Sequence, residues 1–82
     1  MCRNITTLRG LEPAASDEEI EAAARQYVRK VTGVQTTSAT TERAVERAVA
    51  IITAATQDLL LDLPPRRQPP KTVPPLRRRR DA

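Results

Sequence analysis

The chain has 82 residues, enough for one small domain, and its 14 Lys and Arg against 10 Asp and Glu give a net charge of +4. It contains no His and one Cys, which removes the commonest metal ligand and proton shuttle and excludes an internal disulfide. No Gly-rich phosphate loop, paired-carboxylate site or nucleophile constellation is present, so we predict no enzyme, no metal and no cofactor. Because no apolar run approaches a membrane span and the start lacks a signal-peptide pattern, we expect a cytoplasmic protein without membrane contact.

The first residues do not follow a regular period. Ile5, Leu8 and Leu11 are spaced by three, and β-branched residues occur without a clean apolar–polar alternation. A short strand, a turn of helix and an ordered arm lying on the helices all fit this pattern. We predict an extended N-terminal arm.

A first helix is predicted over about residues 17–32. Ser16-Asp17-Glu18-Glu19 forms a capping box, in which the Ser16 hydroxyl accepts from the Glu19 N–H and the Glu19 carboxylate accepts from the Ser16 N–H. Gly33 ends the helix because glycine enters the left-handed region most cheaply. The apolar residues form one stripe with helical spacing, in which we expect Tyr27 to be core: Ile20, Ala23, Ala24, Tyr27, Val28 and Val31.

A second helix is predicted over about residues 41–62, after a hydroxyl-rich loop at 34–40 with Ser38, Thr40 or Thr41 as its cap. Its buried stripe comprises Val45, Ala48, Val49, Ile52, Ala55, Thr56, Leu59, Leu60 and Leu63. Ile51 and Leu61 fall beside or opposite this stripe and widen the apolar surface beyond what a shorter partner helix can cover. A core without Phe or Trp also leaves little margin for a monomer, so we predict a dimer.

The last residues, 64–82, carry seven bases against one acid, or +6, whereas residues 1–63 carry seven bases against nine acids, or −2. Three successive units begin with Pro-Pro, which disfavours a helix beyond Leu63 and favours solvated polyproline II. The predicted fold class is therefore mainly α: a two-helix antiparallel hairpin domain (1–63) with an extended N-terminal arm, followed by a disordered Pro/Arg-rich tail (64–82).

The tail bases are candidates for binding a polyanion, either nucleic acid or an acidic protein. A solubilising tail, or one that folds back onto the acidic body, fits the same composition. No aromatic residue in the tail is available to stack on bases, so point-charge attraction is expected instead of sequence reading. The candidate polyanion-binding residues are Arg66, Arg67, Lys71, Arg77, Arg78, Arg79 and Arg80.

Cys2 is the one candidate functional thiol. Removal of Met1 would leave it at the N-terminus, with an α-amine and Arg3 beside the thiol. No His or second Cys is present as a base or resolving partner, so an incidental or structural thiol is the competing interpretation.

Several segments resemble a family of small bacterial proteins known only as a domain of unknown function. They are Met1-Cys2-Arg3-Asn4-Ile5, Leu8, Asp17-Glu18-Glu19-Ile20, Ala24, Tyr27-Val28-Arg29-Lys30-Val31, Gly33 and Arg47-Ala48-Val49. The resemblance covers about residues 1–63. The chain departs from it at 36–40, which lacks a proline before the serine, and at Ala44-Val45, where members tend to carry Phe. The resemblance implies a short helical fold in a cytoplasmic setting and no particular activity.

Three hypotheses of function follow. The first is a non-enzymatic helical interaction module, dimeric, whose basic tail contacts polyanions or an acidic partner. The second is a ribbon-helix-helix-like DNA-binding regulator, in which Arg3, Thr7 and Arg9 would project from a strand paired between two chains. The third is a redox or thiol protein that depends on Cys2.

Overall fold

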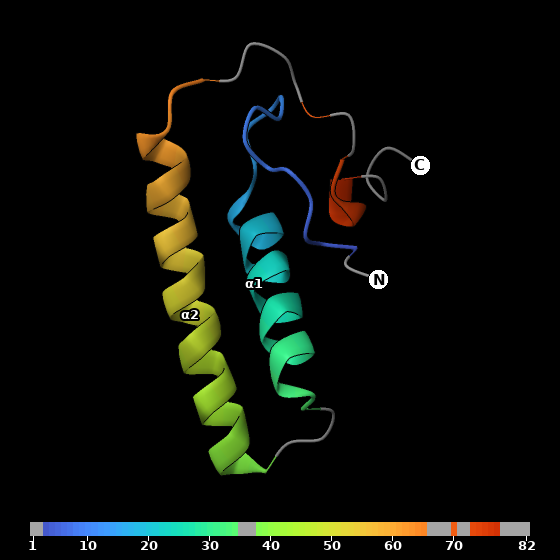
Figure 1. Cartoon of the computed structure of the whole chain (residues 1–82), viewed down its shortest axis with the longest axis vertical. Coiled ribbons are helices and arrows are strands. Elements are labelled where there is room, and N and C mark those ends of the chain that lie inside the picture. Colours follow the sequence, from blue (N-terminus) through green and yellow to red (C-terminus); the bar gives the residue numbers. More distant parts are fainter. Residues whose placement is uncertain (1–2, 35–37, 66–69, 71–72, 78–82) are drawn as a thin grey trace.

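Two helices packed side by side make up most of the molecule (Figure 1). The computed structural model describes residues 3–34, 38–65, 70 and 73–77. Helix α1 spans Asp17–Thr32 and helix α2 spans Ala39–Asp62, and they run antiparallel. The predicted two-helix hairpin with an extended N-terminal arm is confirmed, with α1 at its predicted bounds and α2 starting two residues earlier than predicted.

The ends of α1 are set by local hydrogen bonds. The Ser16 Oγ accepts from the Glu19 N–H at 3.1 Å, and Glu19 Oε1 accepts from the Ser16 N–H at 2.8 Å, so the predicted capping box is present. At the other end Gly33 has φ 68° and donates its N–H to the Arg29 carbonyl at 2.9 Å. A side chain at this φ would be strained, which explains why glycine ends the helix.

Helix α2 begins at a single hydroxyl cap. The Ser38 Oγ accepts from the Thr41 N–H at 3.2 Å, which selects Ser38 among the three predicted candidates. The helix ends at Asp62, and its C-cap Leu63, directly before Pro64, donates its N–H to the Leu59 carbonyl at 3.0 Å. Proline has no N–H and restricts the residue before it, so the helix stops there.

The core consists of two small clusters along α1. Ala24 and Val28 of α1 pack against Val49 of α2, which is 1% exposed, with Val45, Ala48 and Ile52 at the margin. The second cluster, at the N-terminal end of α1, joins Ile20 to Leu8 and Leu11 of the arm, with Ala15, Leu60 and Val73 packed around it. The first cluster holds α2 on α1, and the second joins the arm and Val73 to Ile20 of α1 and Leu60 of α2.

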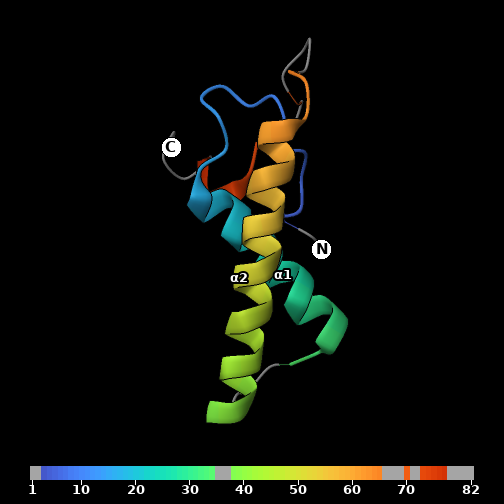
Figure 2. The ribbon, with the colours of Figure 1, turned by 90° about the vertical axis from the view of Figure 1, so that its left-hand side faces the viewer.

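The predicted stripes are buried only in part. Tyr27 is 50% exposed and Val31 63%, so the prediction that Tyr27 is a core residue is wrong. Leu59 is also exposed. Figure 2 shows that α1 and α2 cross and that the C-terminal turns of α1 diverge from α2, in keeping with the exposure of Tyr27 and Val31.

Residues 73–77 return to the body of the protein and pack beside the arm, on the side of α1 opposite α2 (Figure 1). Val73 contacts the Leu8, Leu11 and Ile20 cluster, and Pro74 is fully buried. Residues 75–77 form one helical turn, in which Arg77 donates its N–H to the Pro74 carbonyl at 3.1 Å. This part of the tail therefore belongs to the core, because the two apolar residues inside the basic tail supply surface that the small hairpin lacks.

Within the described ranges, neither helix is long and apolar enough to cross a membrane.

Candidate interaction surfaces

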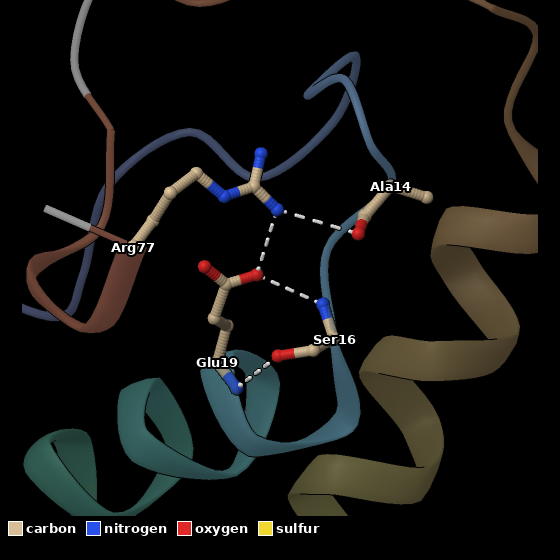
Figure 3. Close-up of polar contacts among 4 residues, drawn as sticks. All are labelled: Ala14, Ser16, Glu19 and Arg77. Atoms are coloured by element: carbon tan, nitrogen blue, oxygen red, sulfur yellow. Dashed lines mark hydrogen bonds and ion pairs between the residues drawn. The ribbon is translucent and has the colours of Figure 1, made fainter. Parts of the chain in front are cut away.

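The tail is anchored by one buried ion pair at the start of α1 (Figure 3). Arg77 Nη2 lies 3.1 Å from Glu19 Oε1 and 3.4 Å from the Ala14 carbonyl oxygen. The Glu19 side chain is 1% exposed and the Arg77 side chain 14%. One carboxylate oxygen therefore serves both the helix cap and the tail, and it joins Glu19 to Arg77, 58 positions away in the sequence.

Glu19 remains ionised in this environment. Burial alone raises the pKa of its carboxyl, but the Ser16 N–H, the Arg77 hydrogen bond and the Arg77 charge together lower that pKa below the ordinary 4.5. The second oxygen, Oε2, is buried without a hydrogen-bond partner in the described part of the chain. Arg77 is thus the cation that compensates the buried carboxylate. Removing Arg77 would leave an uncompensated buried charge, which destabilises the fold.

The two sides of the helix pair differ in character. On one side Arg25 of α1 forms a bidentate ion pair with Glu46 of α2, at 2.5 and 2.9 Å, and Gln57 Nε2 donates to Asp17 Oδ1 at 2.8 Å. Helical spacing places the apolar residues Ala23 and Tyr27 on the other side of α1, away from Arg25. Polar contacts between the helices are therefore concentrated along one side.

The surface of α2 that points away from α1 carries large exposed apolar residues. Helical spacing from Val49, which faces α1, places Ile51, Ala54 and Asp58 on the opposite side. Ile51 is 63% exposed, and Leu61, at one flank, is 83% exposed. We call this surface the outward face of α2; it comprises Arg43, Ala44, Arg47, Ile51, Ala54, Ala55, Asp58, Leu61 and Asp62, all exposed.

A groove of about 610 Å³ separates the C-terminal half of α2 from the arm. Leu11, Ile20 and Leu60 line its apolar wall, and Asp58 and Leu61 connect it to the outward face of α2. Arg9 closes one end by donating to the Pro64 carbonyl oxygen at 2.6 and 3.0 Å. The groove therefore borders the outward face of α2.

Among the candidate site residues, the structure places Arg77 alone. Its guanidinium donates hydrogen bonds to Glu19 and to the Ala14 carbonyl oxygen. Arg77 was predicted as a polyanion-binding residue, but in the structure it contributes to the fold. The other candidates, Cys2, Arg66, Arg67, Lys71, Arg78, Arg79 and Arg80, lie outside the described residues. Of the residues proposed to read bases from a strand, Arg3 and Thr7 are exposed and Arg9 is bound to Pro64.

Sequence reasoning missed the anchor because both partners had sufficient local explanations. Glu19 completes a capping box, and Arg77 is one base among seven in the tail. The available signal was Val73, Pro74 and Leu76, apolar residues embedded next to Arg77 in an otherwise charged segment. Nothing among the described residues forms a cluster of acids and thiols that could hold a metal ion.

The chain belongs to a family described as "Uncharacterized conserved protein (DUF2277)", whose model matches residues 1–82. The predicted resemblance to a family of unknown function is confirmed, but its expected end near Leu63 is wrong, because the match includes the tail. Searches of curated proteins and of solved structures give no significant match. The family extends over the tail segment that packs against α1, in keeping with a fold that needs this segment.

Proposed function

We propose that this protein is a non-enzymatic, cytoplasmic interaction module that associates with a second copy of itself through the outward face of α2. The observation that carries the proposal is the exposure of Ile51 and Leu61 at the middle and end of a 24-residue helix covered on one side only. A domain with so few buried apolar residues gains stability by burying this surface between two copies.

The tail adds the second part of the proposal. Six bases, Arg66, Arg67, Lys71, Arg78, Arg79 and Arg80, are proposed to contact a polyanion or an acidic partner, and Arg77 is assigned to the fold instead. Arg78–Arg80 directly follow Arg77 in the sequence, so the anchor ties the start of this basic run to the helical body. Point charges attached to a folded anchor suit sequence-independent binding of phosphates.

The self-association is tested by sedimentation equilibrium over a range of protein concentrations. Ile51→Glu places a charge at the middle of the outward face and should convert the dimer to a monomer. Tyr27→Glu is the matched control, since Tyr27 is also an exposed large apolar residue but lies on α1. A wild-type protein that stays monomeric, or a dimer lost in Tyr27→Glu and kept in Ile51→Glu, would refute the proposed surface.

The tail contacts are tested without removing the anchor. Deleting residues 64–82 would also remove Val73, Pro74 and Arg77 from the fold, so the six bases are replaced by Gln and Arg77 is kept. Binding to a fluorescent duplex DNA should disappear in this variant. If all six bases meet phosphates, the wild-type affinity should fall with a log–log salt slope of about −5. Unchanged DNA binding in the six-Gln variant would contradict the proposal.

The two other hypotheses have their own outcomes in the same assays. DNA binding that survives the six-Gln change but is lost in Arg3→Ala with Arg9→Ala would favour the ribbon-helix-helix-like regulator. The described residues of the arm form no β-strand, which favours the interaction module. A Cys2→Ser protein that keeps every property would exclude the thiol hypothesis.

A further inference from the structure

The charges on the outward face of α2 have an order that α2 alone does not favour. Arg43 and Arg47 lie near the N-terminus of the helix, and Asp58 and Asp62 lie near its C-terminus. The helix dipole prefers acids at the N-terminus and bases at the C-terminus, so both groups are at the wrong end. Each group is also a like-charge pair four residues apart, which destabilises a helix further.

These charges are not compensated within the described chain. Arg47, Asp58 and Asp62 form no ion pair with another described residue, and the one hydrogen bond recorded for the Arg43 guanidinium joins it to Thr40 Oγ1 at 3.4 Å. The neighbouring acid Glu46 is already bound to Arg25. The arrangement therefore calls for an external partner whose charges run in the opposite order.

A second α2 in the antiparallel direction has that order. When Arg47 lies opposite the partner's Asp58, the same register places Arg43 opposite the partner's Asp62 and Ile51 opposite the partner's Ala54. Twofold symmetry then repeats each pair, so four ion pairs flank a small apolar centre. Ala44 falls opposite the partner's Leu61, which gives this exposed side chain a small residue to pack on.

We propose that two copies pair through the outward faces of α2, antiparallel, in the register that joins Arg47 to the partner's Asp58. This rests on the proposed self-association and specifies its geometry. Ala54 and Ala55 keep the centre of the face small, which lets the two helix backbones approach closely. The two α2 helices then form the middle of the dimer, and each α1, with its arm and residues 73–77, lies outside.

Other partners fit the same face less well. A parallel copy would place Arg47 against Arg47 and Asp58 against Asp58, which is repulsive at both ends. A polyanion would meet Asp58 and Asp62, and a polycation would meet Arg43 and Arg47. A partner with both signs in reverse order is required, and this chain supplies one.

The test uses two charge-reversed proteins and their mixture, measured by sedimentation equilibrium. Arg47→Asp alone makes the proposed contacts acid against acid, and Asp58→Arg alone makes them base against base. Each variant should raise the dimer dissociation constant at least about tenfold, because symmetry applies the change twice. An equimolar mixture should dimerise within about threefold of the wild type, since both contacts then join an acid to a base.

Arg3→Asp provides the control, since it makes the same charge change as Arg47→Asp at an exposed position of the arm, outside α2. It should leave the dissociation constant unchanged, and circular dichroism should show the same helix content for all variants. A dimeric wild type whose two charge-reversed variants fail to recover on mixing would overturn the register and leave self-association standing. A monomeric wild type would overturn both. A mixture that dimerises more tightly than the wild type would indicate a parallel pair and also overturn the register.

Discussion

Helix α1 and helix α2 differ in how many of their residues are buried. In α1, with 16 residues, Glu19, Ile20, Ala24 and Val28 are buried, whereas in α2, with 24 residues, Val49 alone is buried. α1 packs against α2 and also against the arm and residues 73–77, while α2 is covered by α1 and, near Leu60, by the arm (Figures 1 and 2). This difference shows that most of the core forms around α1. It also shows that α2 has more apolar surface than the fold of a single chain buries.

The largest expected effect comes from the residue where the two helices meet. Val49→Asp would bury a carboxylate without a partner and should cost about 4 kcal/mol or more, enough to unfold most of a chain this small. Urea denaturation followed by circular dichroism measures the loss at fixed protein concentration. Val31→Asp, the same change at an exposed position of α1, should cost less than about 1 kcal/mol. Equal costs at the two positions would show that Val49 is not the centre of the packing.

The anchor on α1 should have the next largest effect. Arg77→Ala leaves the buried Glu19 carboxylate without its cation and should lower the free energy of unfolding by about 2–4 kcal/mol. Glu19→Gln together with Arg77→Ala should recover part of that loss, because no charge is then left buried. A double-mutant cycle measures the coupling between the two side chains. A coupling near zero would mean that residues 73–77 do not depend on this pair.

The same pair predicts the acid sensitivity of α1. The folded pKa of Glu19 lies below the ordinary 4.5 despite burial, because of the hydrogen bonds from Ser16 and Arg77 and the Arg77 charge. A lowered folded pKa means that the ionised carboxylate stabilises the fold above about pH 4.5 and that this contribution disappears as the pH falls through the folded pKa. The stability difference between wild type and Arg77→Ala should therefore be large at about pH 7 and should shrink as the pH falls through the folded pKa of Glu19. A difference that does not change with pH would contradict the assignment.

The smallest effect is expected for the ion pair that joins the two helices. Arg25 and Glu46 are both partly exposed, and the hydrogen bond from Arg25 lowers the pKa of Glu46. Exposed pairs contribute little, so a double-mutant cycle on Arg25→Ala and Glu46→Ala should give a smaller coupling than the cycle on Glu19 and Arg77. Added salt should weaken this coupling more than that of Glu19 and Arg77. A larger coupling for Arg25 and Glu46 than for Glu19 and Arg77 would show that the ion pair between the helices contributes more to stability than the buried pair.

The local features of the fold could be predicted because they depend on neighbours in the sequence. The capping box at Ser16, the left-handed Gly33 and the stop before Pro64 each follow from a few adjacent residues. The exposure of Tyr27 could not be predicted, since it depends on how the helices cross, which helical spacing does not specify. The docking of residues 73–77 was also missed, because an ion pair between Glu19 and Arg77 has no signature in either local segment.

The outward face of α2 could be predicted only in part from the sequence. The excess apolar surface at Ile51 and Leu61 is visible in the helical spacing alone, and it led to the prediction of a dimer. Which side of α2 remains open, and hence which charges accompany Ile51, required the position of α1 against Val49. Only then did the reversed order of bases and acids along this face become apparent.

The most direct test of antiparallel pairing is the distance between identical spin labels in the two copies. Both proteins carry Cys2→Ser and one introduced cysteine for the spin label. The first has it at position 39, at the start of α2, and the second at position 50, near the proposed twofold axis; both sites are exposed. The proposed register separates the two Ala39 labels by about 40 Å along the helix axis and the two Ala50 labels by about 8 Å. A long Ala39 distance together with strong dipolar broadening at Ala50 is the expected result. Two similar short distances, as in a parallel pair, or no intermolecular coupling at either site, would contradict the pairing of α2 with a second copy in this direction.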